Sequence, residues 1–190
     1  TLPGHKFYRY TGDFSIQCPE VATESRPRHD YCDGPTDLRY AAVVYVTGKL
    51  TLGKMGPVHD QHFTGNVIFL ATTGVDLDAT NITRDDYYEG AELKKKTVLQ
   101  VMTVGGDIKF ASTKLIQGHL VNHTKDAAYT NVTIQGLVIA ENWNFNNSRL
   151  IADSYLITKL TRTGVDPGDP DPENPEATAD PNPEPQWSLI

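Results

Sequence analysis

The stretch "IQGHLVNHTKDAAYTNVTIQGLVIAENWNFNNS", residues 116–148, contains the string Ile-Gln-Gly twice, at 116–118 and again at 134–136. An apolar run follows each copy. The segment is rich in Val, Ile, Thr and aromatic side chains and has no helical periodicity, which favours strands. One interpretation is a pair of antiparallel strands that turns near Lys125-Asp126. The other is two coils of a parallel β-helix.

Glycine spacing bears on this choice. Gly48 and Gly65 lie 17 residues apart, and Gly118 and Gly136 lie 18 apart, which fits coils of a parallel β-helix. Only two spacings match, however, and a solenoid should show at least three repeats. We therefore favour an antiparallel fold in which isolated glycines mark bulges or bends of the strands. The repeated Ile-Gln-Gly is then interpreted as architecture and not as a binding motif.

Other segments also indicate strands. β-Rich runs occupy 39–53 and 62–74, and a hairpin is expected over 95–112 around Gly105-Gly106, because Gly-Gly suits a tight turn. Residues 148–162 alternate, with Leu150, Ala152, Leu156 and Leu160 on one face. The sequence thus predicts an all-β protein: a single antiparallel β-sandwich or curved β-barrel of about seven or eight strands.

Composition divides the chain into three parts. Residues 1–37 form an expected N-terminal arm with a cysteine loop, 38–163 the β-domain, and 164–190 an acidic, proline-rich extension. Residues 165–190 hold seven acidic and no basic side chains, while the rest of the chain holds 17 of each sign. A body without net charge lacks the positive field that nucleic acid requires, so no nucleic-acid partner is expected. No apolar run approaches the roughly 18 residues of a membrane span, so none is expected.

Two cysteines, Cys18 and Cys32, lie in a loop with little apolar content. A disulfide between them would close a loop of about 15 residues and contribute roughly 3 kcal/mol. Two free thiols are the alternative. A zinc site lacks both enough thiols and the Cys-x-x-Cys spacing.

Four Asn-x-Ser/Thr triplets, at Asn81, Asn122, Asn131 and Asn146, are candidate glycosylation sites. Chance would give roughly 1.4 such triplets. Together with the expected disulfide, they favour an extracellular or surface-displayed location.

Catalytic and metal-binding candidates are sparse. His59 and His62 beside Asp60 would need further metal ligands, such as His29, Asp30, His119 or His123. Asp76, Asp78 and Asn81 resemble a calcium loop only superficially, because the glycine and the closing glutamate are missing. The acids Asp85, Asp86, Glu89 and Glu92 could supply a glycosidase pair only across a cleft. We therefore expect no metal and no cofactor, and the sequence favours a non-enzymatic role without deciding against an enzyme.

The leading functional hypothesis is a secreted or surface-displayed, glycosylated structural protein: a filament, coat or matrix subunit that acts by self-association through its arm and tail. Trp187, Leu189 and Ile190, at the end of the acidic tail, are the candidate partner-binding residues. The alternative is a closed β-barrel that binds a small apolar ligand, as a carrier or a cyclase/isomerase. Its candidate cavity walls are Tyr40, Tyr45, Phe69, Phe110, Tyr129 and Trp143.

Overall fold

The computed structural model describes residues 5–36, 40–53, 60–89, 92–96, 98–123 and 127–152, with the backbone alone at 86–89 and 92–96. The described residues contain nineteen strands, and their regular secondary structure is entirely β. The prediction of an all-β protein is confirmed. Seventeen of these strands pair in parallel, in four sheets, and only β9 and β10 pair antiparallel.

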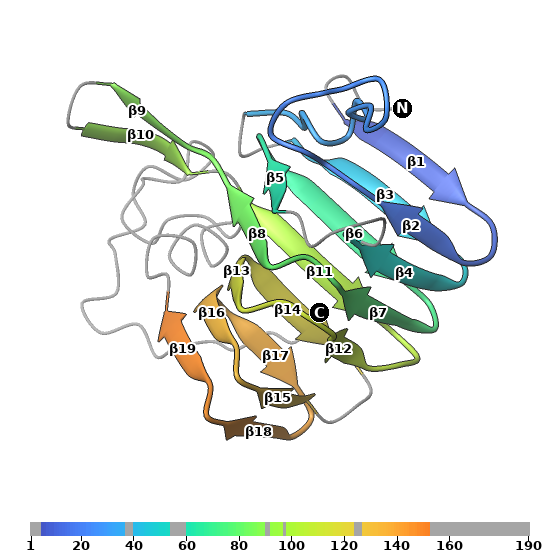
Figure 1. Ribbon diagram of the computed structural model, residues 1–190, viewed down its shortest axis with the longest axis vertical. Helices are drawn as coiled ribbons and strands as arrows, with labels where there is room; N and C mark the ends of the chain where they lie inside the picture. The colour runs from blue at the N-terminus through green and yellow to red at the C-terminus, as the bar shows by residue number, and fades with distance from the viewer. Residues whose placement is uncertain are drawn as a thin grey trace, which may run out of the picture. The chain divides into compact units, whose positions relative to one another are not determined.

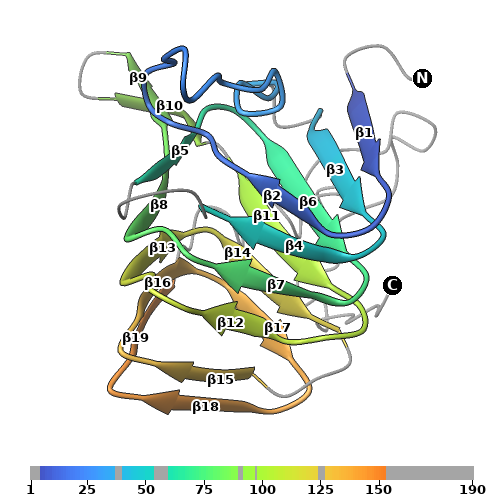
Figure 2. The same ribbon diagram turned by 45° about the vertical axis from the view of Figure 1, so that its right-hand side comes forward.

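The parallel strands stack on three faces (Figures 1 and 2). The first face is one sheet of β1 Lys6–Tyr10, β3 Ala42–Val46, β6 Val67–Ala71, β11 Leu99–Thr103, β14 His119–Asn122 and β17 Val138–Ala140. The second is β2 Phe14–Ile16, β4 Lys49–Leu52, β7 Gly74–Leu77 and β12 Ile108–Phe110, continued by the pair β15 Ala127–Thr130 and β18 Trp143–Asn146. The third is β5 Gln61–Phe63, β8 Asn81–Arg84, β13 Leu115–Gln117, β16 Thr133–Gly136 and β19 Arg149–Ala152.

The chain visits the three faces in turn, so the fold is a parallel β-helix. After the half coil β1–β2, five coils follow: β3–β4–β5, β6–β7–β8, β11–β12–β13, β14–β15–β16 and β17–β18–β19. The prediction of one antiparallel sandwich or barrel of seven or eight strands is wrong. The described strands of each face pair with the strand one coil away, and not with their neighbour in sequence.

The expected hairpin at Gly105-Gly106 is also wrong, since β11 and β12 lie on different faces. The two glycines form the corner between these faces. A Cβ added to Gly106 would overlap the carbonyl oxygen of Thr73, in the corner of the preceding coil. Close stacking of successive corners, and not a hairpin turn, is what requires glycine here.

The only antiparallel pair in the described residues is the hairpin of β9 Asp86–Glu89 and β10 Glu92–Lys96. It is inserted between β8 and β11 and extends away from the stacked strands (Figures 1 and 2).

The two Ile-Gln-Gly copies lie one above the other in neighbouring coils. Ile116 pairs with Ile134 and Gln117 with Gln135 in a parallel register. Both isoleucines are buried, and the Gln117 side chain donates from Nε2 to Oε1 of Gln135 at 3.1 Å. The repeat is therefore one turn of the solenoid.

The core is built of rows of inward-facing side chains, one per coil. Alternation along each strand places every second residue inside. One row on the first face consists of Val44, Phe69, Val101 and Leu120, all fully buried. An aromatic row on the second face joins Phe110, Tyr129 and Phe145, with ring centroids 4.8 and 5.6 Å apart.

The cysteine loop seals the N-terminal end of the stack. The disulfide between Cys18 and Cys32 is present, as predicted, and both residues are fully buried. Tyr31 is also fully buried and packs edge-on against Tyr8 and Phe69. Burial raises the pKa of Tyr31 far above its ordinary value. This plug covers the inward-facing residues of the first coils.

The predicted arm is thus part of the solenoid, since β1 pairs with β3 and β2 with β4. The predicted extension 164–190 lies outside the described residues.

Candidate functional site

In the coil β17–β18–β19, two side chains at core-facing register positions are exposed. Trp143 pairs with Ala127 and Leu150 pairs with Ile134. Ala127 and Ile134 are 2% and 0% exposed, whereas Trp143 is 63% and Leu150 is 41% exposed. No further strand follows β17, β18 and β19 within the described residues. The core rows therefore end at a surface.

The two ends of the stack are therefore unlike. At the N-terminal end, the Tyr31 plug and the disulfide cover the core. At the C-terminal end, β17, β18 and β19 each form the last described strand of their sheet. An edge of this kind offers backbone N–H and C=O groups to an added strand. We use the name C-terminal edge for these three strand edges together with Trp143 and Leu150.

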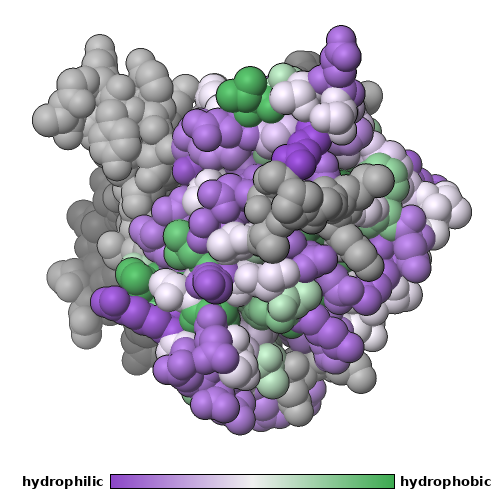
Figure 3. Space-filling view, in the orientation of Figure 1, coloured by the Kyte–Doolittle hydropathy of each residue, from purple (hydrophilic) through white to green (hydrophobic). Residues whose placement is uncertain are grey.

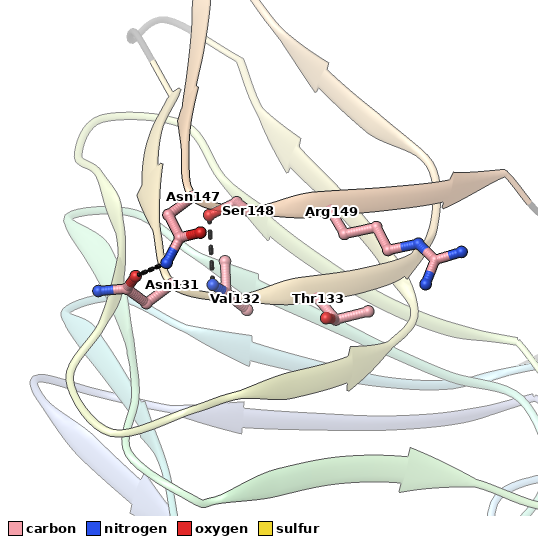
Figure 4. Close-up of a pocket in the computed structure, with 6 residues that line it drawn as sticks. All are labelled: Asn131, Val132, Thr133, Asn147, Ser148 and Arg149. Carbon is pink, nitrogen blue, oxygen red and sulfur yellow. Dashed lines mark hydrogen bonds between the residues drawn. The ribbon is translucent and has the colours of Figure 1, made fainter.

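A shallow hollow of about 330 Å³ lies at the corner between the second and third faces of the last two coils (Figure 4). Asn131 and Asn147 occupy equivalent turns and both have positive φ, 56° and 48°. Nδ2 of Asn147 donates to Oδ1 of Asn131 at 2.6 Å, and the backbone N–H of Val132 donates to Oγ of Ser148 at 3.2 Å. The hollow is lined by Asn131, Val132, Thr133, Asn147, Ser148 and Arg149.

The chemistry of this hollow is hydrogen bonding. Arg149 is the one charged side chain that lines it, and no acid, histidine or thiol lies among its lining residues. The stacked asparagines use their amides to hold successive turns together. This is a structural arrangement and not a general acid–base site.

A polar cluster lies on the outer side of the third face. Nε2 of His62 lies 2.9 Å from Oδ1 of Asp85, and its Nδ1 lies 3.1 Å from Oγ1 of Thr83. Thr64 donates to the other Asp85 oxygen at 3.4 Å. A histidine between a carboxylate and a hydroxyl resembles a catalytic triad, but the Thr83 hydroxyl also donates to the carbonyl oxygen of Gln61 at 3.4 Å. Both ring nitrogens of His62 therefore have partners on the outer side of the third face.

The calcium-loop candidates do not converge on one point. Asp76 pairs with Lys49 at 2.5 Å, Asp78 accepts from Ser112, and Asn81 donates to Asp60 at 2.9 Å. In the part of the chain that the structure describes, no three His, Cys, Asp or Glu side chains are grouped to hold a metal ion.

The four candidate glycosylation sites lie in different settings. Asn131 and Asn146 are exposed, at the corner described above and at the end of β18. Asn81 is partly buried on the outer side of β8. Asn122 is 1% exposed, in the inward row that contains Thr103 and Ala140.

The candidate partner-binding residues Trp187, Leu189 and Ile190 lie outside the described residues. In the part of the chain that the structure describes, the six proposed cavity-wall aromatics do not line one common space. Phe69 and Tyr129 fill the solenoid core, Phe110 packs against it, Tyr45 faces outward, and Trp143 belongs to the C-terminal edge. Tyr40 lies before β3 and contacts His5 at a ring distance of 5.1 Å. The interior is packed by side chains, so the carrier-barrel alternative loses its structural basis.

The face seen in Figure 3 is mostly hydrophilic where residues are described, with hydrophobic side chains scattered over it. Among the described elements there is no helix of the length and apolarity that crossing a bilayer would require.

Comparison with known proteins returns no match: no family model, no curated protein and no solved structure is similar to this chain.

Sequence reasoning did not identify the C-terminal edge. It placed Leu150 on the apolar face of a half-buried antiparallel strand and Trp143 in a cavity wall, whereas β19 pairs in parallel and Leu150 is exposed. The spacing of the Ile-Gln-Gly copies could not supply the register, because the copies are 18 residues apart whereas Leu150 follows its partner Ile134 by 16.

Proposed function

We propose that this chain is an extracellular or surface-displayed structural subunit that associates with a second copy of itself through the C-terminal edge. The observation that carries this proposal is the exposure of Trp143 and Leu150 at inward register positions. In every earlier coil, the next coil covers such positions. A second copy would cover the coil β17–β18–β19, which no described strand follows.

The unlike ends of the stack favour a paired arrangement. The N-terminal end also presents strand edges, those of β1 and β2, but a covalently fixed plug closes its core, so it offers no open core to a neighbour's last coil. Two copies can instead meet through the same edge. Such an isologous contact closes on itself and produces a dimer, which would be the building unit of a coat or matrix.

Backbone pairing and apolar burial would both contribute to the free energy of dimer formation. Fully burying a large apolar side chain contributes about 1.5–3 kcal/mol, and a two-fold contact uses each exposed side chain twice. Association costs at least about 4 kcal/mol of translational and rotational freedom. Trp143 and Leu150 together can exceed that cost only if strand pairing aligns the two edges. The three strand edges supply that alignment.

The compartment is part of the proposal. A buried disulfide is compatible with an oxidising environment. The neutral body and the absence of an acid–base constellation in the described hollow fit a protein that works by contact and not by catalysis.

Sedimentation velocity across the micromolar range tests the contact. The full-length chain should show a concentration-dependent dimer, and Leu150→Lys should be monomeric because it places a charge in the interface. Val104→Lys is the matched control: Val104 is 42% exposed but lies at the corner after β11, away from the C-terminal edge. It should dimerise like the unmodified chain. Far-UV circular dichroism should show that both variants fold.

A full-length chain that stays monomeric throughout this range contradicts the proposal. So does an equal loss of association in Val104→Lys, which would indicate non-specific hydrophobic contact.

The tail is a second contact in this proposal. Trp187, Leu189 and Ile190 would anchor it to a neighbouring subunit, while its proline-rich spacer supplies reach. Deleting 165–190 should leave a folded β-helix whose association is weaker. If deletion instead strengthens association, the tail covers the C-terminal edge of its own chain, and this second contact is wrong.

A further inference from the structure

The four sequons differ in whether the amide nitrogen of the asparagine can reach solvent. At Asn122 the side chain lies inside the solenoid, 1% exposed, in register with Thr103 on one side and Ala140 on the other. Thr103 is fully buried as well. A sugar on this amide would have to occupy the packed interior between two coils.

Asn81 is restricted for another reason. Its Nδ2 donates to Oδ1 of Asp60 at 2.9 Å, on the outer side of the third face. Glycosylation here would exchange an existing contact for a bulky group over a flat sheet surface.

Asn131 and Asn146 are both exposed. Asn131 uses its Oδ1, and not its Nδ2, to hold the stacked turn, and Figure 4 shows Nδ2 directed away from Asn147. Asn146 pairs with Thr130, whose side chain faces outward from β15. A glycan on Asn146 therefore points out from the second face and does not cover the C-terminal edge.

The transfer reaction explains why access to Nδ2 decides the outcome. The nitrogen forms a bond to the anomeric carbon of a lipid-linked oligosaccharide diphosphate and loses one proton, while the lipid diphosphate leaves. The product amide keeps its Oδ1 as an acceptor and one N–H. The hydrogen bond that Asn131 accepts from Asn147 survives this change.

We infer that the folded chain carries N-linked sugar at Asn131 and Asn146 and cannot carry it at Asn122. This inference rests on the extracellular setting of the proposed function. Because a sequon is recognised in an extended chain, Asn122 can receive sugar before folding. Such molecules cannot then close the coil that contains β14, since a glycan is too large for a packed core.

The test is expression of the full chain in a secretory host that glycosylates, followed by site-by-site occupancy from peptide mass spectrometry. The folded, disulfide-bonded fraction should be glycosylated at Asn131 and Asn146 and not at Asn122. Two matched variants each remove one acceptor at the third sequon position. Thr124→Ala should raise the yield of folded protein without changing the mass of its attached sugar. Thr133→Ala should remove one glycan from the folded protein.

Folded protein with sugar at Asn122 overturns the inference, as does a folded fraction bare at both Asn131 and Asn146. Loss of one glycan from folded Thr124→Ala, relative to the unmodified folded protein, would overturn it as well. Occupancy is measured in Leu150→Lys in parallel. The same pattern there separates this result from the success or failure of the dimer proposal.

Discussion

At the scale of single residues, the hydroxyl of Tyr129 is a polar group buried in a largely apolar core. Tyr129 is 1% exposed in the aromatic row between Phe110 and Phe145, and its hydroxyl has no hydrogen-bond partner among the described residues. An unsatisfied buried hydroxyl costs about 1–3 kcal/mol. Burial also raises the pKa of Tyr129 well above its ordinary value.

We predict that Tyr129→Phe raises the free energy of unfolding by about 1 kcal/mol at pH 7, because it removes the unsatisfied group and keeps the ring contacts. The gain should increase above pH 10. In the unmodified protein, the folded-state pKa lies above the unfolded value, so ionisation there favours unfolding. The stability contribution is complete below pH 10 and is lost as the pH rises through the folded-state pKa. Urea denaturation at pH 7 and pH 11 measures both effects.

Tyr129→Leu is the comparison, because it also lacks the hydroxyl but loses two edge-to-face contacts, each worth about 0.5–1.5 kcal/mol. It should be less stable than Tyr129→Phe. A loss of stability in Tyr129→Phe would show that the hydroxyl is hydrogen-bonded in solution.

At the scale of elements, the sequence predicted where strands occur better than how they pair. The β-rich composition of 39–53 indicated a strand, and the structure divides this run into β3 and β4 at the corner Thr47-Gly48. A corner and a bulge have the same local signature, an isolated glycine in an apolar run. The difference lies in what the glycine contacts, which is another coil far away in sequence. That information is not present in a local pattern.

The glycines of the Ile-Gln-Gly repeat illustrate this dependence on stacking. An added Cβ on Gly136 would overlap the backbone carbonyl of Gly118, one coil away. We predict that Gly136→Ala lowers the free energy of unfolding by about 3 kcal/mol, because two backbones must separate. Thermal denaturation of the variant measures this loss.

Gly12→Ala is the matched control. Gly12 has a φ of 82°, but no atom lies within 4 Å of an added Cβ, so only backbone strain of about 1–2 kcal/mol is expected. If the two variants lose equal stability, the close approach of the coils is not the reason for the glycine at position 136.

At the scale of the whole molecule, insertions conceal the repeat. Leu120 and Val138 are 18 residues apart, but Ala42 and Val67 are 25 apart and Val67 and Leu99 are 32 apart. The hairpin β9–β10 accounts for part of the longest coil. A fixed period therefore survives only where no loop is inserted. Of the two glycine spacings, only that of Gly118 and Gly136 is a coil spacing. Gly48 lies between β3 and β4 and Gly65 between β5 and β6, so their spacing does not reflect the repeat. The disulfide was predictable because its signal was local.

Because the coils are stacked in one line, the stability of the molecule depends on how its two ends are covered. In a solenoid each coil contacts only its neighbours, so unfolding can begin at an end that loses its cover. The loop closed by Cys18 and Cys32 holds Tyr31 in the N-terminal end of the core. Replacing both cysteines by serine should lower the free energy of unfolding by about 3 kcal/mol.

The stability lost with the disulfide should appear first in the strands at the N-terminal end. Hydrogen exchange in the doubly substituted chain should speed up in β1, β2 and β3 before it changes in β13 and β16, which lie in the middle and later coils. The unmodified chain under the same conditions is the reference. A uniform loss of protection across all coils would show that the five coils unfold as one unit, and that the plug stabilises the whole stack at once and not only the end that it covers.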